Sequence, residues 1–411
     1  MRRIFIGICA YWMLMAASAV IAGPVQTGLD RLVATDFAAL RGKKVGLITN
    51  PTGVDRQLRS TVDILASSKS VQLISLFGPE HGLRGDHAAG DRVADSLDPV
   101  TQLPVHSLYG AQRKPSAAML AGLDALVFDI QDIGVRSYTY IATLGLAMEA
   151  AAENGIEFIV LDRPNPLGGL RVEGPLPAEG RTSFVAPYPI PYVHGLTVGE
   201  LAKLINDSGW LAGGLRAKLT VIPMRGWRRS MTFEMTGLPW VPSSPHIPQA
   251  ATAALYPATG IVGELSASMI GIGYTLPFGV MAAPNLDAET FANTIGALKI
   301  PGLQVRPLYF TPYYSNGIGK RYGGIQLYLD LREIPSLSLL QFQLLEALIR
   351  QSPESNPFVL HPDRHDMFDK VVADPLIRSA FAQRWSAADV ERLWKTPTDF
   401  IERARRYHLY R

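Results

Sequence analysis

Polar side chains suited to acid, base and hydrogen-bonding chemistry follow four short apolar runs of the chain. The runs cover residues 44–48, 71–77, 124–130 and 157–161. Such runs are typical of buried strands in a parallel sheet, whose carboxyl ends lie at one edge, where ligands bind. The polar residues that follow them are Asn50, Glu80, Asp132, Tyr138, Asp162 and Asn165. The sequence therefore predicts one site assembled from four distant segments.

Glu80 is the strongest candidate for acid or base chemistry. It lies between Gly78-Pro79 and His81-Gly82, so the backbone positions its carboxyl group. A turn carboxylate that caps the next helix is the structural alternative. Glycoside hydrolysis needs a second carboxyl group about 5–9 Å away, and the candidates are Asp129, Asp132 and Asp162. Asp129 is expected to be structural, because it lies inside its apolar run.

Composition and motifs exclude several other functions. A chain of 411 residues with 47% hydrophobic content can bury a large core, and a net charge of +3 without a long basic run does not indicate nucleic-acid binding. No G-x-G-x-x-G follows the first strand, so no dinucleotide or other cofactor is expected. The His and Asp groups at 81–87 and 361–366 match no zinc spacing, so no metal is predicted. Neither a G-x-S-x-G nor an H-E-x-x-H motif occurs.

Residues 1–23 are typical of a secretory signal. Arg2-Arg3 precede an apolar stretch, and small residues offer cleavage after Ala19 or Ala22. An uncleaved membrane anchor is the alternative, and the signal segment would then be the only membrane contact. The single cysteine, Cys9, lies inside this segment, so the mature chain has no thiol. A periplasmic or secreted location is expected.

Strand and helix patterns alternate over about residues 40–165, which predicts a parallel sheet with helices on both faces. A helical pattern over 141–151 stops at Asn154-Gly155, and Thr197 with Glu200 forms a capping box for another helix. Residues 83–114 are expected to be a surface loop that closes over a ligand. A strand at 324–329 and a helix at 337–349 indicate a smaller C-terminal domain. A cleft is expected between this domain and the edge of the N-terminal sheet.

Nine blocks of this sequence resemble the exo-β-N-acetylmuramidase family of bacterial cell-wall recycling. They are residues 44–53, 77–86, 128–140, 161–169, 172–175, 194–201, 226–229, 236–240 and 407–410. The resemblance spans nearly all of the mature chain. It implies an α/β protein with a Rossmann-like catalytic domain at 24–185 and a smaller αβ-barrel-like domain at 186–411 that completes the cleft.

The resemblance also implies an exo-acting glycoside hydrolase. Such an enzyme releases terminal N-acetylmuramic acid from the non-reducing end of peptidoglycan fragments, so its partners are muramoyl saccharides. Glu80 would protonate the leaving oxygen beside Tyr138, and Asp132 or the acetamido group of the substrate would stabilise the anomeric centre. The implied substrate-binding residues are Asn50, His81, Arg84, Gln131, Arg136, Tyr140, Asp162, Arg163, Asn165 and His194. A non-catalytic sugar-binding protein that kept the cleft is the alternative.

One block departs from the family pattern. Where relatives usually carry a polar run with two arginines, residues 269–279 are apolar, with Ile272 and Leu276 at the arginine positions. The lactyl carboxylate of muramic acid favours a bidentate arginine. Arg136 is predicted to bind it because it is nearest to Tyr138, and a pair with Asp132 is the alternative. Arginine at 272 and 276 is expected to raise activity on the muramic substrate.

Overall fold

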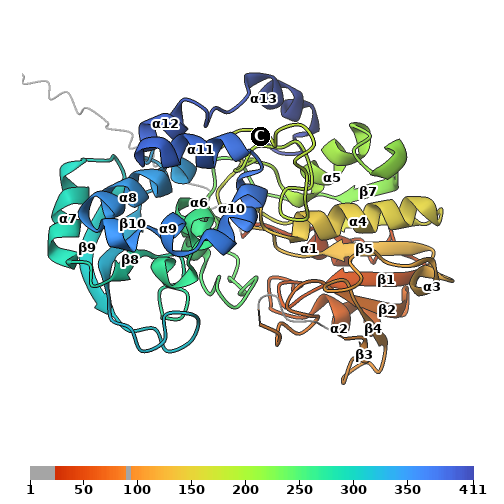
Figure 1. Cartoon of the computed structure of the whole chain (residues 1–411). Coiled ribbons are helices and arrows are strands. Elements are labelled where there is room, and N and C mark those ends of the chain that lie inside the picture. Colours follow the sequence, from red (N-terminus) through yellow and green to blue (C-terminus); the bar gives the residue numbers. More distant parts are fainter. Residues whose placement is uncertain (1–23, 89–93) are drawn as a thin grey trace, which may run out of the picture.

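The computed structural model describes residues 24–88 and 94–411, which form two domains side by side (Figure 1). The segment expected to be a signal peptide, 1–23, lies outside the described residues. Within the described ranges, no helix is long and apolar enough to cross a membrane.

The first domain is built on a seven-stranded sheet. Its strands are β1 (Lys44–Thr49), β2 (Gln72–Gly78), β3 (Ser96–Leu97), β4 (Pro104–Ser107), β5 (Ala125–Asp129), β6 (Glu157–Leu161) and β7 (Lys218–Ile222). In the described chain their order is β3-β4-β2-β1-β5-β6-β7, and every neighbouring pair is parallel except β3 with β4. The four predicted runs are β1, β2, β5 and β6, so the prediction of parallel strands is confirmed.

Helices cover both faces of this sheet, as expected. The helices α1 (Gly28–Ala34) and α2 (Thr61–Ala66) pack on one face, and α4 (Tyr140–Glu153) and α5 (Val198–Asp207) pack on the other. A short helix, α3 (Ala117–Leu120), precedes β5. The capping box at Thr197 and Glu200 begins α5, as predicted.

The C-terminal domain contains a three-stranded antiparallel sheet of order β8-β10-β9 in the described residues. Its strands are β8 (Val280–Pro284), β9 (Leu303–Phe310) and β10 (Tyr322–Leu329). Its helices are α6 (Ala250–Gly263), α7 (Ala288–Ala297), α8 (Leu337–Gln351), α9 (Pro357–Leu360), α10 (His365–Val372), α11 (Pro375–Arg384), α12 (Ala387–Glu391) and α13 (Thr398–Ala404). The α/β class with a mostly parallel sheet and a smaller second domain is confirmed.

The domain boundary expected after residue 185 is wrong. The strand β7 lies beyond it in the sequence and yet pairs with β6 as the edge of the large sheet. The Pro- and Gly-rich stretch before it is packed and is not a linker, because Ile190, Tyr192 and Val193 are fully buried. The chain end also returns to this domain, where the Leu409 amide donates to Glu200 at 2.8 Å.

The segment 83–114 is only partly the loop that was expected. It contributes β3 and β4 to the sheet, and Arg84 is paired with buried Asp98 at 2.6 Å. Gly-, Asp- and Pro-rich composition hid these strands, because both are short and lie at a sheet edge. The part after β4 does reach the ligand side of the sheet, where Tyr109 and Arg113 line a cavity.

Candidate active site

A cavity of about 450 Å³ lies between the carboxyl edge of the large sheet and the C-terminal domain. Glu80, His81, Tyr138 and Tyr140 are the predicted site residues that line it. The lining residues that the sequence reasoning missed include Tyr109, Arg113, Ser244, His246, Tyr256, Glu264, Phe278 and Lys370. Most of these lie on loops or on α6 and α10, where no strand-end pattern or motif marks them.

The carboxyl group of Glu80 is held in one orientation at the end of β2. Its Oε2 accepts a hydrogen bond from Thr139 Oγ1 at 2.7 Å, and the side chain of Tyr109 lines the same cavity. Burial, together with the negative charge of Glu80, raises the pKa of Tyr109 to about 12, so this phenol stays protonated. No helix begins at Glu80 within the described chain, so the capping alternative is not supported.

Two buried phenols stand beside Glu80. The rings of Tyr138 and Tyr140 meet edge to face at 4.9 Å. Tyr138 donates to Ser243 Oγ at 2.8 Å, Tyr140 donates to the Ser243 carbonyl at 2.5 Å, and Asn50 donates to the Tyr140 oxygen at 3.0 Å. Burial raises the pKa of both tyrosines. Asn50 therefore positions Tyr140 and does not itself line the cavity.

A second carboxyl group reaches the cavity from the other domain. Glu264 follows α6, its side chain is 29% exposed, and Arg364 Nη2 lies 3.4 Å from its Oε2. Burial raises the pKa of Glu264 to about 7; Arg364 opposes this shift and the charge of Glu80 adds to it. Two carboxyl groups from two domains thus face one cavity. Glu264 could not be predicted from the sequence, because it follows the end of a helix and belongs to no motif.

Two cationic side chains also line the cavity. The guanidinium carbon of Arg113 lies 4.1 Å from the centroid of the Phe184 ring. Lys370 Nζ lies 2.6 Å from Asp366 Oδ2, and its side chain is 50% exposed. Arg113 and Lys370 are the arginine and the lysine among the described residues that line the cavity. They are therefore the charged groups available to an anionic ligand.

The prediction that Asp132 is catalytic is not supported. Asp132 is 5% exposed and does not line the cavity. Its Oδ2 accepts from the Gly134 amide at 2.7 Å, in a turn where Gly134 has φ +81°. His194 is 1% exposed, and its Nε2 lies 3.7 Å from Asp132 Oδ2. Both residues therefore shape the turn that leads to Tyr138 and are not placed to touch a sugar.

The prediction that Arg136 binds a carboxylate is wrong for this structure. Arg136 has no exposed surface, and its guanidinium donates to four backbone carbonyls. The alternative pair with Asp132 does not form either, since no salt bridge joins them in the described residues. Burial lowers the pKa of Arg136 to about 10. Arg136 is a structural residue. It was predicted to bind ligand only because it is close to Tyr138 in the sequence.

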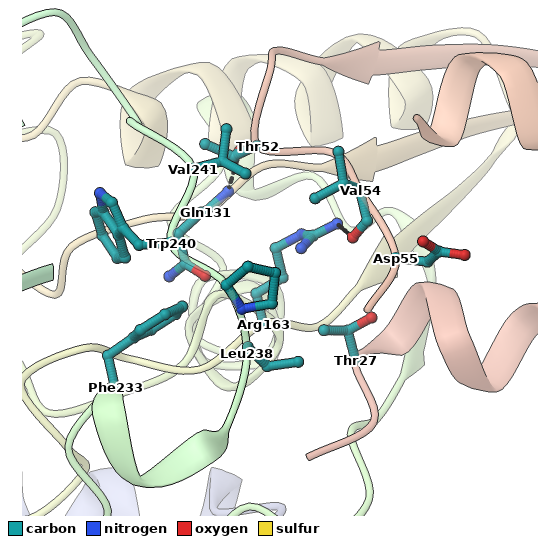
Figure 2. Close-up of a pocket in the computed structure, with 11 residues that line it drawn as sticks. Thr27, Thr52, Val54, Asp55, Gln131, Arg163, Phe233, Leu238, Trp240 and Val241 are labelled. Atoms are coloured by element: carbon teal, nitrogen blue, oxygen red, sulfur yellow. Dashed lines mark hydrogen bonds between the residues drawn. The ribbon is translucent and has the colours of Figure 1, made fainter. Parts of the chain in front are cut away.

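Two further predicted ligand-binding residues are buried in a different place. Arg163 forms an ion pair with Asp129 at 2.6 Å, and Gln131 donates to the Pro164 carbonyl at 2.6 Å. Figure 2 shows both against the segment that carries Leu238 and Trp240. The hollow between them is about 20 Å³, which is room for about one water molecule. Neither residue is free to bind a sugar, and Asp129 is structural as expected.

The remaining strand-end residues also hold the fold together. Asp162 is fully buried and accepts from the Gly199 amide and the Thr197 hydroxyl, each at 2.8 Å. Burial raises the pKa of Asp162 to about 7. Asn165 accepts from the Leu167 amide at 2.9 Å, and Arg84 is occupied by Asp98. None of these three lines the cavity that contains Glu80, so their predicted substrate contacts are not supported.

The apolar block 269–279 contributes little to the cavity wall. Of its residues only Phe278 lines the cavity, whereas Ile272 is 8% exposed in the core and Leu276 packs against a small cluster beside β8. An arginine at position 272 would bury an unpaired charge, and Leu276 is half-buried and does not line the cavity. The structure therefore does not support the expectation that arginine at 272 and 276 raises activity.

No group of three or more potential metal ligands occurs in residues 24–88 and 94–411. The chemistry available in the cavity is that of two carboxyl groups, neutral phenols and two cations.

Comparison with known proteins agrees with this arrangement. The family model for the N-terminal part of exo-β-N-acetylmuramidase NamZ matches residues 45–251, and the model for its C-terminal part matches residues 254–410. The chain is 41% identical over 387 residues to the peptidoglycan β-N-acetylmuramidase NamZ of Bacillus subtilis, covering 94% of this chain and 91% of that protein.

Two crystal structures of DUF1343 family proteins from Bacteroides fragilis are similar to it. One has a TM-score of 0.89 at 46% identity and the other 0.73 at 28% identity; each comparison covers 94% of this chain and 99% of the other. Because the two family models together match residues 45–251 and 254–410, the chain belongs to the exo-β-N-acetylmuramidase family.

Proposed function

We propose that this protein is an exo-acting glycoside hydrolase that removes N-acetylmuramic acid from the non-reducing end of peptidoglycan fragments. The observation that carries the proposal is Glu80, whose carboxyl group accepts a hydrogen bond from Thr139 in the cavity between the domains of a member of this family. Tyr138 and Tyr140 supply neutral walls of the cavity, and Phe278 adds an apolar one.

Glu264, and not Asp132, is the second carboxyl group that lines the cavity. Burial raises the pKa of Glu264 and the negative charge of Glu80 adds to this shift, so Glu264 keeps its proton to a higher pH than an exposed carboxyl group does. Glycoside hydrolysis needs such a pair, with one group protonated and the other charged. The acetamido group of the substrate is the alternative to a protein carboxyl group for stabilising the anomeric centre.

Hydrolysis of chromogenic β-glycosides tests the function. The purified protein is incubated with N-acetylmuramic acid and N-acetylglucosamine glycosides, and release of the chromophore is followed. Release from the muramic substrate supports the proposal. Tight binding without release would favour the non-catalytic sugar-binding protein instead.

We also propose that Arg113 recognises the lactyl carboxylate, with Lys370 as a second cation. Replacing Arg113 with glutamine is expected to raise KM for the muramic glycoside about tenfold, the usual scale for a lost charged hydrogen bond. The N-acetylglucosamine glycoside, which has no carboxylate, should show no such rise. Arg332→Gln is the matched control, because its side chain is 85% exposed and lies outside the cavity. An equal rise in KM for both sugars would argue against this role.

Activity is expected to fall as pH rises through about 7. The pKa of Glu264 is raised to about 7, so Glu264 holds its proton below that pH and loses it above. A proton donor is then missing. Glu264→Gln should remove this alkaline limb from the kcat profile. A limb that persists unchanged in the variant would assign the titration to another group, such as Asp162.

Residues 1–23 support a further proposal, that the chain is exported through a cleaved signal segment and works in the periplasm or outside the cell. The description of the two domains as Rossmann-like and αβ-barrel-like is likewise a proposal, which rests on the resemblance to the family.

A further inference from the structure

A short loop between β9 and β10 exposes large aromatic side chains. Tyr313 is 62% exposed, Tyr314 is 38% exposed, and Ile318 on the same loop is 63% exposed. Exposed apolar side chains that lie next to one another often mark a site of contact with a ligand or partner, and tyrosine is enriched at such sites. The activity described above makes no use of these residues.

This loop is continuous with the cavity. The half-buried ring of His246 lines the cavity and lies parallel to the ring of Tyr314, at 6.0 Å between centroids and 9° between planes. Tyr313 follows at 5.3 Å from Tyr314. The three rings therefore form a row that begins inside the cavity at His246 and ends on the open surface at Tyr313. We call this row the aromatic strip.

The aromatic strip is held in place by the block 269–279. The Tyr313 amide donates to the Gly273 carbonyl at 2.9 Å. Gly273 has φ +100°, and a Cβ there would meet the Tyr314 carbonyl oxygen at 2.3 Å, so only glycine allows the loop to dock so closely. Tyr274 stacks on Phe310 at 4.8 Å and lies 6.4 Å from Tyr313. The block 269–279 thus packs against the loop and holds it in place.

We propose that the aromatic strip binds the sugar rings that follow the terminal sugar of a glycan chain. This rests on the proposed function, because an exo-acting enzyme holds one sugar in its cavity and the rest of the chain must leave through the mouth. The C–H face of an N-acetylhexosamine ring is apolar and slightly positive, so it packs on the negative face of a tyrosine ring. A row of rings that leads out of the cavity gives successive sugars such faces.

The experiment compares a muramic acid-terminated tetrasaccharide with the chromogenic N-acetylmuramic acid glycoside. For Tyr313→Ala combined with Tyr314→Ala, the ratio of the tetrasaccharide KM to the chromogenic KM is expected to rise about tenfold, on the scale of one or two lost ring contacts. Tyr328→Ala, which removes a 48% exposed tyrosine from β10, is the matched control and should leave the ratio at its wild-type value. Thermal unfolding confirms that each variant is folded.

An unchanged ratio in the double variant would overturn the proposal, and so would an equal rise in both KM values. Calorimetric measurement of tetrasaccharide binding distinguishes failure of the strip proposal from failure of the proposed function. If the wild type binds the tetrasaccharide without cleaving it, the function fails, and weaker binding by the double variant still supports the strip. If the wild type does not bind it, the strip proposal fails. Concentration-dependent self-association that disappears in Tyr313→Ala would assign the surface to a second copy of the chain and overturn the proposal.

Discussion

Replacing Glu80 with glutamine is expected to lower kcat on the muramic glycoside at least about a hundredfold, the usual scale for loss of a general acid or base. Glutamine keeps the shape of the side chain and its contact with Thr139, which the carboxylate makes at 2.7 Å. It cannot give up or accept the proton that bond cleavage needs. Substrate affinity should change little, because the cavity walls remain.

Two controls decide whether such a loss of kcat comes from the missing catalytic carboxyl group or from misfolding. Glu289→Gln removes an exposed carboxyl group of α7 and should leave kcat unchanged. The melting temperature of Glu80→Gln should match that of the wild type, since Glu80 is only partly buried. Full turnover by a correctly folded Glu80→Gln would remove Glu80 from the mechanism and leave Glu264 as the carboxyl group to test.

The sheet was predictable because apolar runs of five to seven residues have few alternatives in a chain of this kind. The runs that became β1, β2, β5 and β6 were found in this way, and their polar ends located Glu80 and Tyr138. The strands β3 and β4 were missed because they are short and lie in a polar edge segment. The place of the strand β7 in the large sheet was not predicted, since its pairing with β6 depends on tertiary contacts.

The site was predicted less completely than the sheet, for two physical reasons. A strand end fixes the position of a backbone, but it does not fix whether the side chain points into the cavity or into the fold. Asp162 and Arg163 follow β6, and both point inward to partners that come from distant segments. The cavity also has a second wall from the C-terminal domain, and Glu264 and Lys370 can be found only once the two domains are placed together.

Arg136 shows most clearly how a structural residue can look like a ligand-binding one. Its guanidinium donates to the carbonyls of Pro175 and Ile190 in the first domain and of Val371 and Val372 in the second. The last two carbonyls lie at the C-terminal end of α10, where a cation is favoured by the helix dipole. One side chain thus joins the two domains behind the cavity.

Arg136→Met is therefore expected to lower the free energy of unfolding by at least about 3 kcal/mol, because each buried carbonyl left without a donor costs about 1–3 kcal/mol. Methionine fills most of the space and isolates the loss of hydrogen bonds from the creation of a cavity. The measurement is the midpoint of denaturant unfolding, together with KM for the muramic glycoside well below that midpoint. KM should stay within about twofold of the wild type, since the guanidinium does not reach the cavity.

Arg113→Gln should give the opposite pattern and serves as the matched control. Its side chain is exposed on the cavity wall, so its loss should change stability by less than about 0.5 kcal/mol while KM rises. The two arginines thus separate a residue that binds the ligand from one that holds the domains together. If Arg136→Met unfolds at the wild-type midpoint and raises KM only for the muramic sugar, then Arg136 contacts the carboxylate after all, in a conformation that opens the domain interface.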